Sequence, residues 1–179
     1  PEIKAESSRG LARVEEAIRK AYQGMVKVEA GQAEIGSDFG LPDSLKKTKM
    51  SFKAFYIDKY EVTQGDYDEC VKAGKCEANK KYDGFTGPRQ PVVGVTWNQA
   101  KTYCQWAGKR LPTETEWEKA ARGTDGRKYS WGNQEASCDF AVMNDGGMGC
   151  GRNKTWDVGS KPKGTSPYGA LDMAGNVWE

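Results

Sequence analysis

The stretch after Arg122 constrains the fold most, because almost none of it has the pattern of a helix or a strand. Glycines recur along residues 123–169, and the loop at 144–153 is especially rich in them. A segment of this length without regular structure must be held by cross-links, bound ions or buried tryptophans. The whole sequence has 22 Gly, 6 Trp and 8 Tyr, so we expect a loop-rich domain built around aromatic anchors.

The cysteines offer such cross-links, and none of them forms a Cys-x-x-Cys pair that would indicate a zinc ribbon. Cys70 and Cys76 lie on either side of a turn, and Cys138 and Cys150 flank the glycine-rich loop. As the disulfides Cys70–Cys76 and Cys138–Cys150, they would imply an oxidising compartment. The alternative is a set of buried free thiols in a cytosolic protein. Cys104 is either buried and free or paired with a group outside this chain.

Composition excludes several classes of function. The chain has no histidine, which rules out Ser-His-Asp triads, Cys–His dyads and His-ligated metal sites. Its formal net charge of +2 comes from interspersed acids and bases and indicates no nucleic-acid partner. No apolar run is long enough to cross a membrane.

The first residues differ in composition from the rest of the chain. Residues 5–23 carry apolar side chains at helical spacing, and Gly24 can end such a helix. We therefore expect a helical linker over 1–24, with integration into the domain as the alternative. The domain proper is expected to span 25–179.

Two segments near the start of the domain have strand patterns. Residues 25–37 alternate apolar and polar side chains across Gly31, which predicts a hairpin. Residues 38–50 are polar and loop-like, and residues 51–60 predict a further strand.

Three later segments begin with a threonine followed three residues on by an acid or a glutamine, the pattern of a capping box. The pairs are Thr63 with Asp66, Thr96 with Gln99, and Thr113 with Glu116. They predict helices from 63 to about 71, over 97–107 and over 114–121. A few strands, short helices and long glycine loops indicate an irregular α+β fold with small antiparallel sheets.

The third of these helices opens with acids at Glu114, Glu116 and Glu118. Acids in a first turn are favoured by the helix dipole, and Lys109 and Arg110 are expected to pair with them. Paired acids for glycoside hydrolysis are the sharper alternative.

The end of the chain is a candidate calcium loop. Asp172 and Glu179 could supply carboxylate oxygens, and Gly175 and Val177 could supply main-chain carbonyls. Calcium takes six to eight oxygen ligands and accepts this mixture. The spacing alone also fits a surface turn with solvated acids.

The tryptophans have two interpretations. Most are expected to be core pillars of a domain poor in aliphatic residues, although a sugar-stacking platform is the alternative. Trp156, in a glycine-rich part of the chain, is expected to be the most exposed and is the candidate ligand-binding residue.

The order of the motifs carries a resemblance to a known family. The central run is GVTWNQAKTYCQWAGKRLPTETEWEKAARG at 94–123, preceded by FYIDKYEVT at 55–63 and QPVVGVTW at 90–97. Trp131-Gly132, Tyr168-Gly169 and GNVWE at 175–179 follow in the same order. Over about residues 25–179 the chain resembles the formylglycine-generating enzymes, or sulfatase-modifying factors.

This resemblance implies a compact, irregular fold related to C-type lectin domains. It also implies a structural Ca²⁺ at the positions of Asp172, Gly175, Val177 and Glu179, with Asp172 in place of a family asparagine. A second family calcium site falls near Asp139 and Phe140, where the loop between the two cysteines differs from the family pattern.

Oxidases of the family convert a sulfatase cysteine to formylglycine with two cysteines that bind copper(I). No position here matches either cysteine, since both follow the GNVWE motif in the family. Cys104 matches a family cysteine that is bridged to a partner near the C-terminus, so the resemblance implies a structural role. Another branch, the sulfoxide synthases, needs histidine-bound iron and is excluded because the chain has no histidine.

The resemblance therefore favours a non-catalytic, calcium-stabilised module of an exported bacterial protein, which would be periplasmic, secreted or on the cell surface. Its partner would be a protein or a glycan. The alternatives are a copper-dependent oxidase with its catalytic part beyond residue 179, and an accessory oxidative enzyme. Because the family chain continues past this motif, we expect the domain to be C-terminally incomplete, with a further segment supplied by a longer chain or in trans.

Overall fold

The computed structural model describes residues 22–36 and 47–179, so the helix predicted over 5–23 lies almost entirely outside the described residues. The strands are β1 (Met25–Val28), β2 (Gly31–Ile35), β3 (Thr48–Phe52) and β4 (Phe55–Asp58). The helices are α2 (Gln64–Lys72), α3 (Trp97–Trp106) and α4 (Glu114–Arg122), and a short 3₁₀ helix covers Pro162–Gly164. No helix among the described residues is long and apolar enough to cross a membrane.

The strands form one bent antiparallel ribbon rather than the predicted hairpin at Gly31. β1 pairs with β4 (Val28 opposite Phe55), and β2 pairs with β3 (Gly31 opposite Phe52). The register is the same on both sides of the interruption, so β1 and β2 follow one another along the same partner segment with a kink at 29–30. The hairpin prediction is wrong because β1 and β2 pair with strands that lie further along the chain. The predicted loop over 38–50 also ends early, since β3 starts at Thr48.

A buried lysine holds this kink. Lys119 of α4 is 1% exposed, and its ammonium donates hydrogen bonds to the carbonyls of Glu29 at 2.7 Å and Gly31 at 3.2 Å. It also lies 4.9 Å from the centre of the Phe52 ring. These contacts satisfy carbonyls that the interrupted ladder leaves free, and they place α4 against the ribbon.

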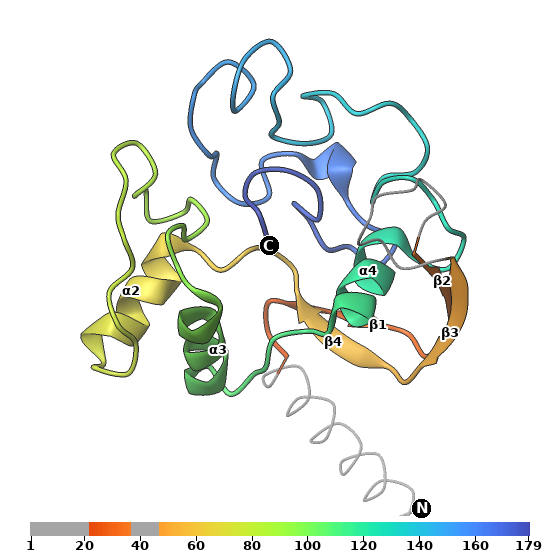
Figure 1. The fold of residues 1–179 in the computed structure, drawn as a ribbon, viewed down its shortest axis with the longest axis horizontal. Helices are drawn as coiled ribbons and strands as arrows, with labels where there is room; N and C mark the ends of the chain where they lie inside the picture. Colours follow the sequence, from red (N-terminus) through yellow and green to blue (C-terminus); the bar gives the residue numbers. More distant parts are fainter. Residues whose placement is uncertain (1–21, 37–46) are drawn as a thin grey trace, which may run out of the picture.

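The three predicted helices are confirmed, and each begins with a complete capping box. The side chains of Thr63, Thr96 and Thr113 accept from the backbone of the third helical residue, whose side chain bonds back. α2 and α3 pack together through Tyr67 and Tyr103, whose ring centres are 5.7 Å apart. Figure 1 shows this helix pair on one side of the molecule and α4 with the ribbon on the other.

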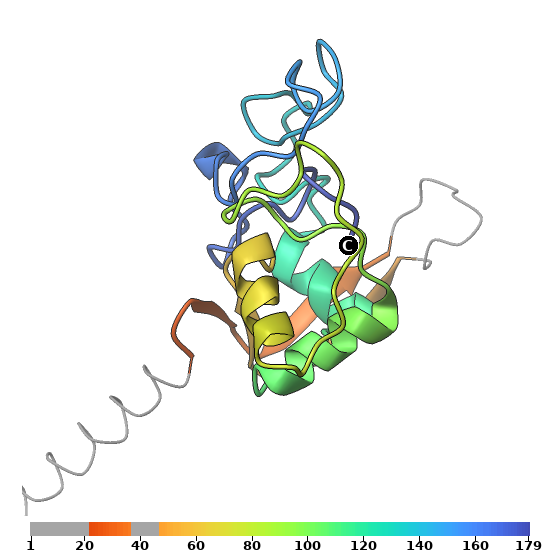
Figure 2. The same cartoon turned by 90° about the vertical axis from the view of Figure 1, so that its left-hand side faces the viewer.

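The chain after Arg122 forms turns that cover the top of the molecule in Figures 1 and 2, as the glycine pattern predicts. Within this part, Tyr129 stacks on Trp131 at 4.7 Å, and Trp131 stacks on Phe140 at 5.1 Å. Gln90 ties it to the first half, because its amide donates to the carbonyl of Thr155 at 2.7 Å.

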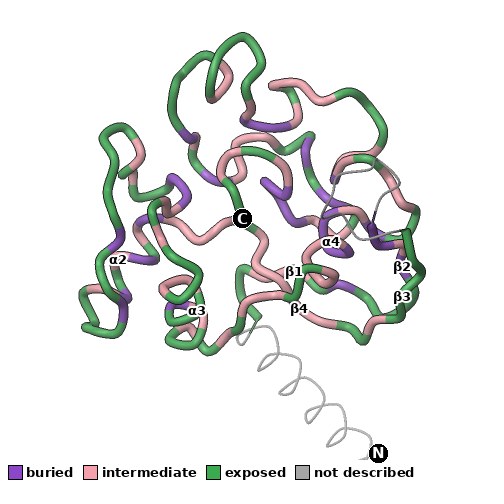
Figure 3. The backbone as a smooth tube through the Cα atoms, in the orientation of Figure 1, coloured by how far each residue is buried: buried purple, intermediate pink, exposed green. Residues whose placement is uncertain are grey.

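The principal core lies where the chain up to Arg122 meets the turn-rich chain after it. It contains Val28 of β1, Ala120 and Ala121 of α4, and Ala170 and Met173 near the chain end. Figure 3 shows buried segments from both parts converging around α4. The core therefore anchors the chain at Ala170, just before the candidate calcium loop, and again at Met173 within it.

Candidate calcium loop

The loop from Asp172 to Glu179 is held in a conformation that turns its backbone sharply. Asp172, Gly175 and Asn176 have positive φ values of 60°, 89° and 62°. Just before the loop, Leu171 donates its backbone N–H to the carbonyl of Lys59 at 2.8 Å. A Cβ atom at Gly175 would lie 2.5 Å from the carbonyl oxygen of Val142, so this close approach requires glycine.

The two predicted carboxylate ligands each accept one hydrogen bond. Asp172 is 7% exposed and accepts from the backbone N–H of Gly159 at 2.5 Å. Burial raises the pKa of Asp172, and the bond from Gly159 opposes that shift. Glu179 accepts from the indole N–H of Trp117 in α4 at 2.5 Å. Each carboxylate keeps oxygen lone pairs for a further ligand.

A third carboxylate, Glu61, joins the loop and was missed by the sequence reasoning. Its Oε2 accepts from the side-chain amide of Asn176 at 2.8 Å, whereas its Oε1 is buried without a hydrogen-bond partner. Burial, followed by the charge of Asp172, raises the pKa of Glu61 to about 9, although the bond from Asn176 and the nearby backbone N–H of Val177 lower it. Glu61 lies 115 residues before Asn176, so local spacing could not connect it to the loop.

These groups fit a hard cation. An orphaned carboxyl oxygen that is buried costs stability, and a cation would satisfy it and favour the ionised form of Glu61 beside Asp172 and Glu179. The carbonyl of Gly175 accepts from the N–H of Val177 at 2.8 Å and has a second lone pair free. Among the described residues, no three acidic or thiol side chains converge closely enough to hold a metal alone. Main-chain carbonyls would therefore have to complete the ligand set.

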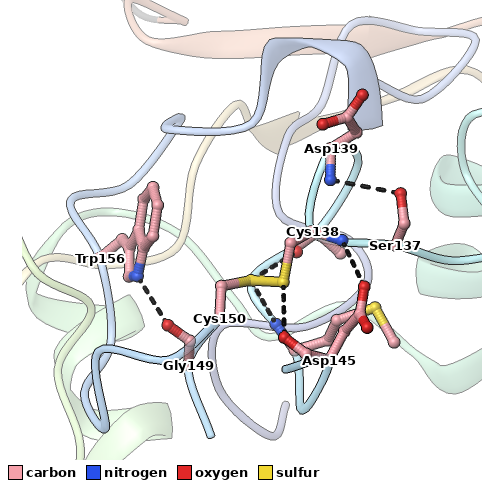
Figure 4. The surroundings of a disulfide bond; sticks show 9 residues. Ser137, Cys138, Asp139, Asp145, Gly149, Cys150 and Trp156 are labelled. Carbon is pink, nitrogen blue, oxygen red and sulfur yellow. Dashed lines mark hydrogen bonds between the residues drawn. A yellow bond between two sulfur atoms is a disulfide. The ribbon is translucent and has the colours of Figure 1, made fainter. Parts of the chain in front are cut away.

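The region of the predicted second calcium site contains an ion pair. Asp139 is exposed, and its carboxylate lies 3.0 Å from the ammonium of Lys163, which lowers the pKa of Asp139. Its backbone N–H donates to Ser137, as Figure 4 shows. The carbonyl of Phe140 is packed against Gly164. A calcium ion here would have to displace Lys163, and this second site stays a prediction.

Both predicted disulfides are present. Cys70 bonds to Cys76 at the end of α2, and Cys138 bonds to Cys150 across the glycine-rich loop (Figure 4). Cys104 is the free cysteine among the described residues and is half-buried in α3. Burial and then Asp58 raise the pKa of its thiol, against an opposing effect of Lys109.

The prediction that Trp156 is the most exposed tryptophan is wrong. Trp156 is half-buried, whereas Trp97, Trp106 and Trp178 are 66%, 40% and 102% exposed. The indole N–H of Trp156 donates to the carbonyl of Gly149 at 3.0 Å. Its backbone N–H donates to the side chain of Asn176 at 3.0 Å. Trp156 is thus tied both to the disulfide loop and to the candidate calcium loop.

The predicted network at the start of α4 is confirmed in part. Arg110 forms a two-pronged ion pair with Glu116, with both N–O distances at 2.7 Å. Lys109 instead pairs with Asp58 at 2.5 Å. Glu118 pairs with Arg122 and accepts from the backbone N–H of Gly36 at 2.9 Å. These acids are engaged in structural contacts.

Comparison with known proteins decides the family. Residues 11–179 match the model of the sulfatase-modifying factor enzyme 1-like domain. The chain belongs to this family. The match begins within the segment predicted to be a linker.

Two relatives illustrate the range of named activities in the family. A protein of Bos taurus named inactive C-alpha-formylglycine-generating enzyme 2 is 42% identical, over 87% of this chain and 69% of that protein. The formylglycine-generating enzyme of Mycobacterium tuberculosis is 45% identical over 50% of this chain. The chain spans only 32% of the length of that mycobacterial relative.

The solved structures confirm the fold. Treponema denticola variable protein 1 superposes with a TM-score of 0.66 and 26% identity, over 86% of this chain and 70% of that one. The domain has the irregular α+β, C-type-lectin-like fold of the formylglycine-generating enzymes, with few helices and small antiparallel sheets.

Proposed function

We propose that the chain is a non-catalytic, calcium-stabilised module of an exported bacterial protein, acting in binding or structural assembly. The observation that carries the calcium part is the buried, unpartnered Oε1 of Glu61 beside the loop of Asp172 and Glu179. Carboxylates gathered with turn carbonyls are what Ca²⁺ requires.

Calcium binding is tested by thermal unfolding in Ca²⁺ and in EDTA. A ligand at 100 times its Kd stabilises the folded state by about 2.7 kcal/mol, so Ca²⁺ should raise Tm by several degrees. Glu61→Gln should lose most of this response, because it removes one carboxylate while keeping the size and the bond to Asn176. The control is Glu135→Gln, which changes an exposed acid elsewhere. An unchanged Tm in EDTA would refute calcium binding.

Export is supported by the two disulfides, since disulfides persist mainly outside the reducing cytosol. Thiol labelling of the unreduced, denatured protein from its native host should leave Cys70, Cys76, Cys138 and Cys150 unlabelled. Labelling of all five cysteines would contradict an oxidising compartment.

The non-catalytic part of the proposal rests on the cysteines. Four of the five cysteines are paired in disulfides, and burial disfavours the thiolate form of Cys104. Thiolates are the form that binds copper and reacts. The similarity over most of this chain to a bovine protein named as inactive also supports a non-catalytic function.

The second candidate is a copper-dependent oxidase that converts a sulfatase cysteine to formylglycine, with its copper-binding cysteines outside residues 1–179. The 45% identity to the mycobacterial formylglycine-generating enzyme favours it. The discriminating assay incubates the natural full-length protein with copper(I), oxygen and a sulfatase-type cysteine peptide. Formation of formylglycine, detected by mass spectrometry, would overturn the non-catalytic proposal.

A further inference from the structure

Two cations lie against the same tryptophan ring. The guanidinium carbon of Arg152 is 3.7 Å from the ring centre of Trp156, and the ammonium of Lys161 is 4.1 Å from it. The two charges are therefore no more than about 8 Å apart, because their separation cannot exceed the sum of their distances to the shared ring centre. We call Arg152, Trp156 and Lys161 the cation–indole cluster.

Neither cation lies within ion-pair distance of a carboxylate in the part of the chain that the structure describes, although the charge of Lys161 contributes to the lowered pKa of Asp139. The acids in this region have other partners, since Asp139 pairs with Lys163 at 3.0 Å and Asp157 pairs with Arg89 at 3.5 Å. Neither Arg152 nor Lys161 forms an ion pair or a side-chain hydrogen bond among those residues. Their N–H groups are thus available to an external acceptor.

The scaffold beneath the cluster is held in one conformation. Trp156 is fixed through its indole N–H to Gly149, next to the Cys138–Cys150 bond, as Figure 4 shows. Its backbone is held on both sides by Asn176, which accepts from its N–H and donates to its carbonyl. A site that is already ordered loses less entropy when a ligand binds.

We propose that the cation–indole cluster binds an oxyanion, specifically a sulfate or carboxylate group of an acidic polysaccharide. Arginine presents a planar fork of N–H groups that matches such oxyanions, and lysine adds a point charge. Each cation can donate a charge-assisted hydrogen bond of about 2.8 Å to an oxyanion that binds beside the ring. This inference rests on the binding function proposed above and gives its ligand a chemical class.

The geometry favours a charged polysaccharide over two alternatives. A neutral sugar or a nucleic-acid base would stack on the face of the indole, but the two cations occupy the space over that ring. Nucleic-acid binding also relies on a broad basic surface, whereas the chain has a formal net charge of only +2. The cluster therefore recognises a local oxyanion and not an aromatic ring or a long phosphate backbone.

The test measures binding of dextran sulfate oligosaccharides to the intact chain by calorimetry, at low and physiological salt. Arg152→Gln and Lys161→Gln should each weaken binding about tenfold, because each removes one charge-assisted contact. The matched control is Lys101→Gln, which removes a single cation 5.1 Å from the ring centre of Trp97, an exposed tryptophan. It should change the affinity less than twofold. Inorganic sulfate should compete at millimolar concentration, and neutral dextran should not bind.

Three results would overturn the inference: equal losses in all three variants, wild-type affinity in Arg152→Gln, or tighter binding of a single-stranded oligonucleotide of equal charge. The first would indicate a nonspecific charge effect, and the last a nucleic-acid ligand. These failures are distinct from failure of the proposed function. Formylglycine formation would overturn the non-catalytic module without changing this affinity series, and the series can fail while calcium still stabilises the chain.

Discussion

The part of the domain up to Arg122 and the part after it have different sources of order. The first contains the described strands and the three capped α-helices. The second has only the three-residue helix Pro162–Gly164 as regular structure in residues 123–179. It is held by the Cys138–Cys150 bond, by a stack of three aromatic rings and by side chains that cross to the first part.

This difference between the two parts explains where the candidate calcium loop and the cation–indole cluster form. Regular elements satisfy their own backbone, whereas turns leave carbonyls and N–H groups for other partners. The candidate calcium loop uses both parts, since Glu61 follows β4 and Asp172 lies in the turns. The cation–indole cluster lies wholly within the turns. Substitutions confined to one part of the domain can therefore separate the contributions of the two parts.

The largest effect is expected from removing the disulfide of the turn-rich part. Cys138→Ser with Cys150→Ser opens a loop of sequence separation 12, and should cost about 3 kcal/mol of unfolding free energy. Cys70→Ser with Cys76→Ser opens a separation of 6, and should cost about 2 kcal/mol. Urea unfolding measures both losses. Limited proteolysis should cut the first variant within 123–179, and cleavage first in α2 would contradict the comparison.

The next effect concerns the tether between the two parts. Gln90 is buried, donates to Thr155 and Gly84, and accepts from the backbone N–H of Gly87 at 2.7 Å. Gln90→Ala leaves these groups unsatisfied and should cost about 2 to 3 kcal/mol. Hydrogen exchange should speed up around residue 155 as well as near residue 87.

The control for the tether is Gln105→Ala, which changes an exposed glutamine of α3. It should alter the unfolding free energy by less than about 0.5 kcal/mol. If Gln90→Ala behaves like this control, the two parts do not depend on the tether.

A smaller loss is expected within the first part. Lys119→Met keeps the length of the side chain but removes the donor to the carbonyls of Glu29 and Gly31. It should cost about 2 kcal/mol, which urea unfolding would measure. Lys101→Met, on the exposed face of α3, is the control. An unchanged stability for Lys119→Met would mean that the kink in the ribbon needs no support.

The smallest effect is a pH dependence at the start of α4. Arg110, with the N–H of Thr113 assisting, lowers the pKa of Glu116 from 4.5 to about 2. Because the folded pKa is the lower one, this stabilisation is present above pH 4.5 and is lost as pH falls toward 2. Solvent screening of the exposed Arg110 limits it to about 1 kcal/mol.

Glu116→Gln should remove that part of the acid dependence of unfolding. Glu135→Gln, which changes an exposed pair with Lys128, should retain it. Identical acid denaturation curves for the wild type and Glu116→Gln would contradict the assignment to this ion pair.

Much of the fold was predictable because its signals are local. Thr96 and Gln99 define a helix start within four residues, and the helix over 97–106 begins where they predict. Cys138 and Cys150 flank one glycine-rich loop, and they are bonded. Pairing of 25–28 with 55–58 was missed, since alternation shows that a segment is a strand but not which strand it joins.

The candidate site was predictable only in its contiguous part. The acids and turn residues of 172–179 can be found from their spacing, but Glu61 has no local signal that relates it to them. Trp156 was expected to be exposed because its surroundings are rich in glycine. Arg152 and Lys161 cover its ring, and their approach depends on how the turns fold.

The sequence by itself determined the three capped helices, the two disulfides and the turn-rich character of the chain after Arg122. Each depends on residues close enough along the chain to meet at little cost in chain entropy. Only the tertiary structure decided the strand pairing, the burial of Glu61 beside the Asp172 loop, and the meeting of two cations on Trp156. The first two join residues far apart in the chain, and the third depends on side-chain directions in irregular turns. No periodic pattern in the sequence records any of them.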